Sequence, residues 1–264
     1  MRIVSLNAWG GAMFDQLAPW VQAVDADVLC LQEVTRTPGV SGWTQFEDGE
    51  RSLPQRANLF QDVKALRPSD QAIMVTSDAG PVTDESGVRR RQDFGIATFI
   101  REELPLTGLQ TAFVHGHFVD DDDWSTDARA RVALAASVID RPQDRTVAVI
   151  QLHGLRDPAG KHDTPARKAQ AERLAELVER TGSSADLTVV CGDLNLLPDS
   201  ETFAVLAKVG LTDLVGQADT RTSAYTKPTR HANYLLVSDR TAVKSFTIAT
   251  QPEVSDHRAL ILDI

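Results

Sequence analysis

Apolar residues fall in short runs along this chain, and polar side chains follow several of these runs directly. The runs are only a few residues long and rich in Val, Ile and Leu, which is typical of buried β-strands. Strands are predicted in this way over residues 2–6, 27–31, 94–100, 147–152, 187–190 and 258–264. Residues 132–138 alternate between apolar and other side chains, which predicts one further strand despite the alanines.

Two other segments have the signals of helices. Apolar residues recur at helical intervals within residues 14–25. A second helix is expected to begin after Thr164, a favourable N-cap followed by proline in the first turn, and to end at Gly182. The chain shows no internal repeat and no linker, so we expect one α/β (α+β) domain over residues 1–264.

Acids, amides and histidines stand where the predicted strands end or begin. Because α/β proteins gather their functional sites at strand ends, such a set indicates chemistry rather than solvated loops. The residues are Asn7, Glu33, His153, Asp193, Asn195, Asp256 and His257. Each motif alone has a simpler interpretation, since residues 192–195 are typical of a turn, His153 of a loop, and Asp256 with His257 of a cap on the last strand.

Taken in order, these motifs resemble those of the endonuclease/exonuclease/phosphatase superfamily, which has the deoxyribonuclease I-like fold. The matching pieces are Ser5-Leu6-Asn7, Leu31-Gln32-Glu33, Leu152-His153-Gly154-Leu155, Gly192-Asp193-Leu194-Asn195 and Ser255-Asp256-His257. The resemblance spans almost the whole chain. It implies a four-layer sandwich of two packed mixed β-sheets flanked by helices, with the active site at one edge. Residues 36–93 correspond to the family's variable region, which we expect to shape substrate choice.

The resemblance also implies roles in phosphoester hydrolysis. Glu33 is the principal ligand of a divalent cation, and Asn7 assists at the metal or at a phosphate oxygen. Carboxylate and amide oxygens suit Mg²⁺ or Mn²⁺. Asp193 orients or deprotonates the attacking water, and Asn195 donates to a non-bridging phosphate oxygen.

Histidines complete the implied site, and one residue departs from the family pattern. His153 donates to the phosphate, and His257 acts as a general acid–base or as a cationic stabiliser, positioned with help from Asp256. Asn233 stands where the family usually has Asp before Tyr. An amide supplies no negative charge, so activity that needs protonated His257 should fade at a lower pH than in relatives.

The chain is acidic, with 27 basic and 37 acidic residues and a net charge of −10. Because binding to duplex DNA relies on Lys and Arg to neutralise phosphates, this balance argues against a dedicated nucleic-acid binder. Arg89-Arg90-Arg91, the one dense basic run, is either a solvated loop or a phosphate clamp at the rim of the site. Residues 120–123 are all Asp and are expected to form a solvated acidic loop, with a second cation site as the alternative.

Cys30 and Cys191 each lie within or beside a predicted strand, so small buried thiols are expected rather than a disulfide. The sequence has no apolar run of the roughly 20 residues that span a bilayer, and it opens without a signal-like segment. We therefore expect a cytoplasmic protein that binds no membrane and needs no obligate protein partner.

The expected function is divalent-metal-dependent hydrolysis of a phosphoester, with a small-molecule substrate favoured over nucleic acid. The acidic charge and His153 favour this substrate class. An endonuclease or exonuclease acting on DNA or RNA is the first alternative. Because Asn233 replaces the usual Asp, a phosphate-binding module with weakened catalysis is the second.

Overall fold

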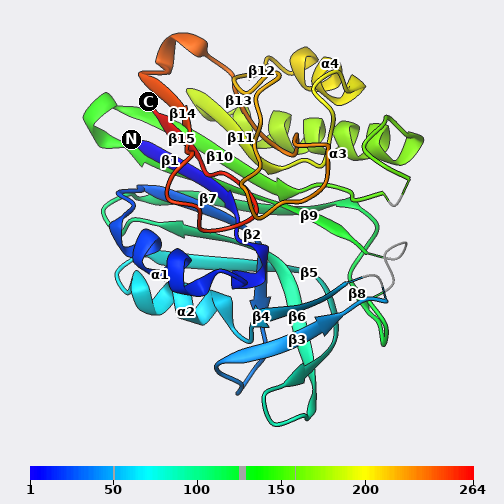
Figure 1. Ribbon diagram of the computed structural model, residues 1–264. Helices are drawn as coiled ribbons and strands as arrows, with labels where there is room; N and C mark the ends of the chain where they lie inside the picture. Colours follow the sequence, from blue (N-terminus) through cyan, green and yellow to red (C-terminus); the bar gives the residue numbers. More distant parts are fainter. Residues whose placement is uncertain (50, 125–128, 158) are drawn as a thin grey trace.

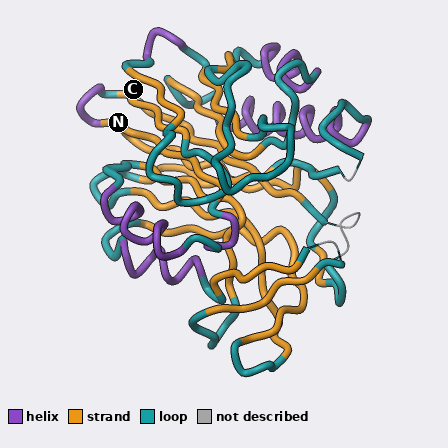
Figure 2. Tube along the Cα trace, viewed as in Figure 1, coloured by secondary structure: helices purple, strands orange, loops and turns teal. Residues whose placement is uncertain are grey.

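Two β-sheets pack face to face in the computed structural model, which describes residues 1–49, 51–124, 129–157 and 159–264. Helices cover the outer face of each sheet, so the molecule has four layers (Figure 1). This architecture confirms the predicted sandwich of two mixed sheets flanked by helices. The two chain ends lie side by side (Figure 2), and the amino group of Met1 donates to the carbonyl of Ile264 over 2.9 Å.

The first sheet has nine strands within the described residues, and they come from both ends of the chain. Their order is β14, β15, β1, β2, β6, β5, β3 and β4, with β8 paired to β5. Their bounds are β1 Arg2–Asn7, β2 Val28–Arg36, β3 Trp43–Glu47, β4 Ser52–Arg56, β5 Gln71–Asp84, β6 Arg89–Ile100, β8 Val119–Asp120, β14 Ser245–Ile248 and β15 Leu260–Asp263. The sheet is mixed because β1 and β2 run parallel whereas β2 and β6 run antiparallel.

The second sheet has six strands within the described part of the chain, in the order β12, β13, β11, β10, β9 and β7. Their bounds are β7 Leu106–His115, β9 Arg131–Asp140, β10 Arg145–His153, β11 Leu187–Asp193, β12 Thr212–Asp213 and β13 Asn233–Val237. The central pair, β10 and β11, is parallel, and its neighbours are antiparallel. The strands that end in predicted site residues therefore lie in the middle of both sheets.

Four α-helices occur in the described residues, two for each sheet. Helices α1 (Phe14–Ala23) and α2 (Leu59–Leu66) cover the first sheet, and α3 (Pro165–Gly182) and α4 (Glu201–Lys208) lie on the side of the second. The short 3₁₀ helices are η1 Trp9–Gly11, η2 Arg141–Gln143 and η3 Arg240–Ala242. Both predicted helices are confirmed, and the hydroxyl of Thr164 accepts from the backbone N–H of Arg167 over 3.2 Å, as an N-cap does. Among the described helices, none combines the length and the apolar character needed to cross a bilayer.

The sandwich buries both faces of its central strands. In β2, Val28 and Cys30 face the other sheet, whereas Leu29 and Leu31 face α1 and α2. Because successive side chains of a strand point to opposite faces, a strand buried on both must be apolar throughout. This is why continuous apolar runs predicted the central strands. Cys191 lies in the same core between the sheets, and both thiols are free and buried, as predicted.

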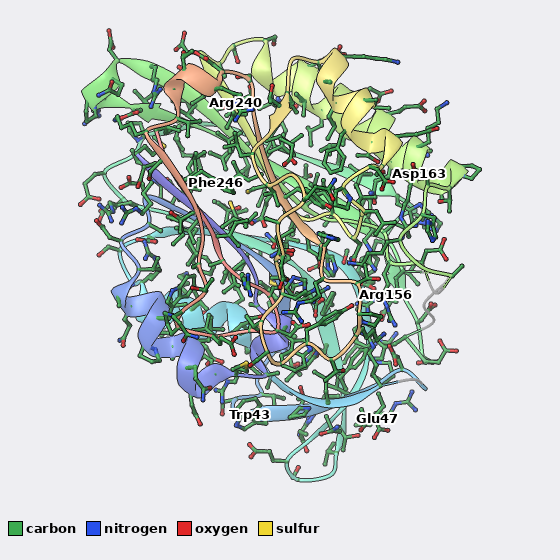
Figure 3. The ribbon with its side chains drawn as sticks, turned by 45° about the horizontal axis from the view of Figure 1, so that its top comes forward. Trp43, Glu47, Arg156, Asp163, Arg240 and Phe246 are labelled. Atoms are coloured by element: carbon green, nitrogen blue, oxygen red, sulfur yellow. The ribbon has the colours of Figure 1, made fainter. Side chains whose placement is uncertain are left out.

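Residues 36–93 contain extensive regular structure, although their apolar runs are short. They form the β3–β4 hairpin, α2 and much of the long β5–β6 ladder. Residues 89–91 therefore begin β6 and pair with β5, so the loop interpretation of this basic run is wrong. Trp43 and Glu47 of β3 lie at the end of the molecule opposite Arg240 (Figure 3).

Candidate active site

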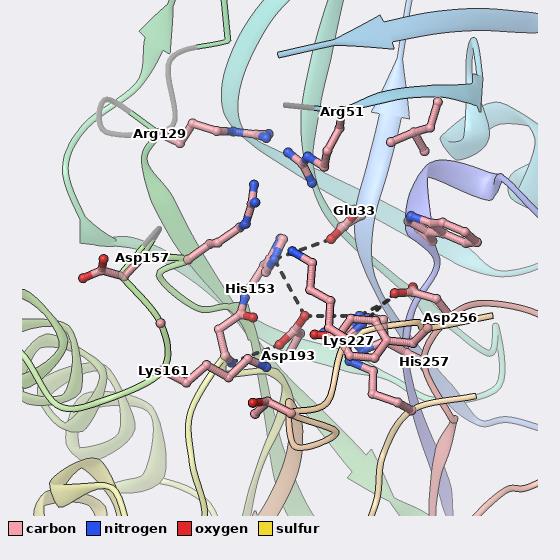
Figure 4. Close-up of a pocket in the computed structure, with 18 of the residues that line it drawn as sticks. Glu33, Arg51, Arg129, His153, Asp157, Lys161, Asp193, Lys227, Asp256 and His257 are labelled. Carbon is pink, nitrogen blue, oxygen red and sulfur yellow. Dashed lines mark hydrogen bonds and ion pairs between the residues drawn. The ribbon is translucent and has the colours of Figure 1, made fainter. Parts of the chain in front are cut away.

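Site residues from four strands meet at one end of the sandwich. Asn7 ends β1 and pairs in register with Gln32, the neighbour of Glu33 in β2. In the second sheet, His153 and Asp193 end the parallel strands β10 and β11 and pair with each other. Hydrogen bonds join the two sheets here, because Nδ2 of Asn7 donates to Glu33 Oε1 over 2.9 Å and to Asp193 Oδ2 over 3.0 Å. Glu33, His153 and Asp193 consequently point toward one another (Figure 4).

Glu33 lies within a strand and not after its end as predicted. Strand β2 continues to Arg36, and its register with β6 shifts between Gln32 and Val34. Glu33 occupies this β-bulge with a φ of 55°, a left-handed conformation that is uncommon outside glycine. The bulge re-aims the side chain into a cavity. Backbone strain of this kind clusters at functional sites.

Asp193 owes its position to the glycine before it. Gly192 has a φ of 142°, and a Cβ atom there would lie 2.0 Å from the carbonyl oxygen of Leu152, so only glycine lets β11 approach β10 this closely. Because β11 ends at Asp193, Asn195 lies in the following loop, and its position does not follow from the two-residue repeat of a strand. Its backbone N–H donates to Asp193 Oδ1 over 3.0 Å, and its Nδ2 lies 3.4 Å from the carbonyl oxygen of Gly154.

Glu33, His153 and Asp193 form a candidate metal site. One donor atom of each residue lies within 4.8 Å of the other two. Nε2 of His153 is 3.7 Å from Glu33 Oε1 and 3.9 Å from Asp193 Oδ2. Two carboxylates and one imidazole suit a divalent cation. Asn7 turns its amide nitrogen toward both acids, while its oxygen accepts from the N–H of Trp9 over 3.0 Å.

His257 lies on the other side of Asp193, with Nε2 3.5 Å from Oδ2. Its Nδ1 is 2.6 Å from Oδ1 of Asn233, and an amide oxygen only accepts, so the ring carries a proton on Nδ1. Nε2 then accepts from Nη1 of Arg221. Asp256 lies 3.6 Å from Nε2 and accepts from Arg221 over 2.7 Å, so the ring is held by Asn233 and Asp256 acts through the arginine.

Burial and neighbouring arginines keep both site histidines neutral. Burial lowers the pKa of His153 to about 4, and Arg131 adds to this shift. The pKa of His257 lies well below its usual value, first because the ring is buried and then because Arg221 adjoins it. Burial opposes ionisation of Asp193 too, but the basic groups around it hold the pKa of this carboxyl well below its usual range. At neutral pH a carboxylate therefore lies between two neutral imidazoles.

The site residues line a cavity of about 490 Å³ whose charge is opposite to that of the chain. Eight lining side chains are Arg or Lys and four are Asp or Glu, although the chain carries a net charge of −10. The basic residues are Arg51, Arg129, Arg131, Arg156, Lys161, Arg167, Arg221 and Lys227. Arg51 and Arg129 lie at one end, across Glu33 and His153 from His257 (Figure 4). Positive charge enclosed by low-dielectric walls attracts anions.

No sequence pattern predicted this basic lining, because its members are scattered from residue 51 to residue 227. The dense run Arg89–Arg91 lies outside the cavity, so the phosphate-clamp interpretation is also wrong. Arg91 instead pairs with Asp120 and, over 3.1 Å, with Asp122, so the basic and acidic runs neutralise each other on the surface. Arg131 directly precedes the strand predicted over residues 132–138, and in the structure it begins β9.

Two mixed sheets have central strands whose ends carry acids, amides and histidines around an anion-attracting cavity, and this arrangement matches the deoxyribonuclease I-like fold of a family of phosphoester hydrolases. Residues 4–257 match the Endonuclease/Exonuclease/phosphatase family, and the chain belongs to that family. The order of the motifs predicted this membership.

Solved structures share the fold over nearly the full chain. An endonuclease/exonuclease/phosphatase family protein from Bacteroides thetaiotaomicron is 16% identical, with a TM-score of 0.67 over 99% of this chain and 96% of that chain. A mannosyl-6-phosphatase from the same organism is 15% identical, with a TM-score of 0.64 over 100% and 98%. TDP2 from D. rerio, complexed with a single strand DNA product, is 15% identical, with a TM-score of 0.63 over 99% and 97%. No curated protein sequence matches the chain. The fold is thus shared by a phosphatase and a DNA-bound protein, and it leaves the substrate open.

Proposed function

We propose that this protein is a divalent-metal-dependent hydrolase that cleaves a small phosphoester with an activated water. The observation that carries the proposal is the convergence of Glu33, His153 and Asp193 within 4.8 Å in a basic cavity. Phosphoester hydrolysis needs both a bound cation and positive charge around the phosphate. A cavity of about 490 Å³ is in the size range of small-molecule pockets.

Glu33 and Asp193 would hold the cation, with His153 as the third donor. The carboxylates fit Mg²⁺ or Mn²⁺, and the imidazole favours Mn²⁺ within that pair. When bound, such an ion supplies positive charge to phosphate oxygens and lowers the pKa of water. Asn7 keeps the two acids at a fixed separation through its paired hydrogen bonds.

Asp193 and His257 would move the protons. Both carboxylate oxygens of Asp193 accept a hydrogen bond, Oδ1 from the backbone N–H of Asn195 and Oδ2 from Nδ2 of Asn7. Oδ2 is the oxygen that faces His257, so it is the one that would take a proton from the attacking water. Nε2 of His257, which carries no proton in this tautomer, lies 3.5 Å from this oxygen. It could take the proton from Oδ2 and pass it to the leaving group. A neutral ring suits this acid–base role better than the cationic role.

Arg221 would supply the positive charge that a neutral His257 does not. Its Nη1 contacts both Asp256 and His257, while its buried Nε has no hydrogen-bond partner among the described residues. Asn195 makes only a long hydrogen bond of 3.4 Å through Nδ2, so this group can donate to a non-bridging phosphate oxygen. Both donors stabilise negative charge that develops during hydrolysis.

A substrate panel tests the proposal. The purified protein is assayed with bis-p-nitrophenyl phosphate, p-nitrophenyl phosphate, plasmid DNA and single-stranded RNA, each with Mg²⁺, Mn²⁺ or EDTA. Metal-dependent release of nitrophenol without plasmid nicking is the expected result. Nicking or RNA cleavage at a higher rate would support the nuclease alternative. Phosphate binding without turnover of any substrate would support a binding module.

A further inference from the structure

Two buried arginines of the cavity have one ion-pair partner between them among the described residues. Arg129 and Arg131 are only 7% and 3% exposed. Nε of Arg129 donates to Asp78 Oδ2 over 2.5 Å. Arg131 has no carboxylate oxygen within 4.0 Å in the described residues, and Nη1 makes its one hydrogen bond there, of 3.3 Å, to the carbonyl of Ala130. Within 4.0 Å, Asp78 is therefore the one carboxylate of the described residues that pairs with either guanidinium group. The charges of Asp78, Glu33 and Asp193 act on Arg131 from a greater distance.

Each arginine also has a hydrogen-bond donor without a partner among the described residues. Nη2 of Arg129 and Nε of Arg131 are buried and have no partner among the described residues. Burying an unpaired charge is strongly unfavourable, so such a group implies a compensating ligand. Burial, followed by the charge of Arg129, lowers the pKa of Arg131 to about 10, which leaves it charged at neutral pH. Arginine forks match phosphate geometry.

The ring of Phe94 lies between Arg129 and His153, whereas Arg131 is close enough to the candidate metal site for its charge to act on Glu33, His153 and Asp193. The guanidinium carbon of Arg129 lies 4.4 Å from the ring centroid of Phe94, and this centroid is 6.2 Å from that of His153. Arg51, whose Nε donates to Asp48 over 2.8 Å, directs its guanidinium group toward the same space (Figure 4). The cavity thus has two anion-attracting ends.

We propose that Arg129 and Arg131 form a second anion subsite, and that the substrate is a small phosphoester that carries a second phosphate group. The inference rests on the proposed function, which places the scissile phosphate at Glu33, His153 and Asp193. The second phosphate is bound at the arginines and is not hydrolysed there. Phe94 contacts the part of the substrate that joins the two phosphates.

Titration of inorganic phosphate into EDTA-treated protein tests the subsite without turnover. Arg131→Met should weaken phosphate binding about 10- to 100-fold, the range for losing charge-assisted hydrogen bonds. Arg131→Lys should weaken it less, because lysine keeps the charge but not the fork. Arg180→Met is a matched control on the exposed face of α3 and should bind phosphate as the wild type does. Equal affinity of the wild type and Arg131→Met would contradict the proposal.

Thermal unfolding distinguishes this role from a structural one. Methionine fills a similar volume without a buried charge, so the Tm of Arg131→Met should equal or exceed that of the wild type. A Tm lowered by more than about 5 °C would mean that the guanidinium stabilises the fold, and it would overturn the subsite assignment.

A matched substrate pair tests the substrate class. Glucose 1-phosphate and glucose 1,6-bisphosphate differ in one phosphate, and kcat/KM should be higher for the bisphosphate by about 10-fold or more. Arg131→Met should bring this ratio toward one. A wild-type ratio near one, or faster cleavage of single-stranded DNA than of the bisphosphate, would refute the assignment. If no phosphoester is cleaved, the proposed function fails, and the phosphate titration alone decides whether the subsite exists.

Discussion

The cavity and the surface around the start of β6 contain the same kinds of charged residue but use them differently. On the surface, Arg91 pairs with Asp120 and Asp122, whose side chains are 52% and 93% exposed. In the cavity, Arg131 and Asp193 are almost completely buried, and Arg131 has no carboxylate partner among the described residues. Water screens the ion pairs on the surface. The buried charges of the cavity are screened less, so they can act on a bound ligand. The site is therefore distinguished by the burial of its charged side chains, and not by the density of charge along the sequence.

The largest decrease in activity is expected for Asp193→Asn, because this change keeps the shape of the buried side chain but removes its ability to accept a proton. If Asp193 accepts a proton during hydrolysis, kcat for p-nitrophenyl ester cleavage should fall about 10²- to 10⁴-fold. Asp199→Asn is the matched control, because Asp199 is exposed and outside the cavity. Near-normal turnover of Asp193→Asn would remove this residue from the proposed mechanism.

Burial of His153 should make metal-free protein sensitive to acid. The native pKa of about 4 lies below the unfolded value of 6.5, so between these pH values the unfolded chain binds a proton that the native protein does not. Stability is thus expected to fall from pH 7 to pH 4, by up to about 3 kcal/mol from this group.

Two nearby groups also titrate in this range, so a difference measurement is needed. His257 acts in the same direction as His153, whereas burial raises the pKa of Asp256 to about 7, so Asp256 opposes the trend. Urea unfolding at several pH values in EDTA should show a smaller pH dependence for His153→Gln than for the wild type. Parallel curves for the two proteins would argue against a buried, neutral His153.

Glu33→Gln should weaken metal binding, because it removes one of the two carboxylates in the candidate metal site. A decrease of at least about 10-fold in Mn²⁺ affinity is expected. Calorimetric titration with Mn²⁺ measures this effect independently of turnover. Glu172→Gln, on the exposed face of α3, provides the matched control. If both variants bind Mn²⁺ like the wild type, Glu33 is not a ligand.

Asn233→Asp should shift the pH dependence of activity. The new carboxylate would lie at the position of Oδ1, which is 2.6 Å from Nδ1 of His257, and would favour the protonated ring. Because the neutral ring is the form that takes part in proton transfer, the acid limb of the kcat profile should move upward by about one pH unit or more. An unchanged acid limb would show that the protonation state of His257 does not limit turnover.

The smallest effect is expected at the start of β6. Arg91→Met breaks exposed ion pairs with Asp120 and Asp122, so stability should change by about 0.5 kcal/mol or less and kcat/KM should not change. Denaturant unfolding and the ester assay check both values. If Arg91→Met lost as much activity as Arg131→Met, the exposed ion pairs at the start of β6 would matter for activity as the cavity does, which would contradict the comparison.

Much of the fold was predictable from local patterns. The central strands and helices α1 and α3 were found because burial on both sheet faces requires continuous apolar runs and because helix ends have their own signals. The hairpin of β3 and β4, helix α2 and the strand β12 were not found, because these elements are short: five residues in each hairpin strand, eight in α2 and two in β12.

The sequence by itself determined the family and most of the polar site, because Asn7, His153, Asp193 and His257 belong to motifs with a recognisable order. Only the tertiary structure decided the rest. The bulge that re-aims Glu33, the contact of Arg221 with His257 and the burial of Arg131 without an ion-pair partner among the described residues depend on neighbours far away in the chain. Local residue types encode which groups are present, whereas burial and long-range pairing set their charge, orientation and partners.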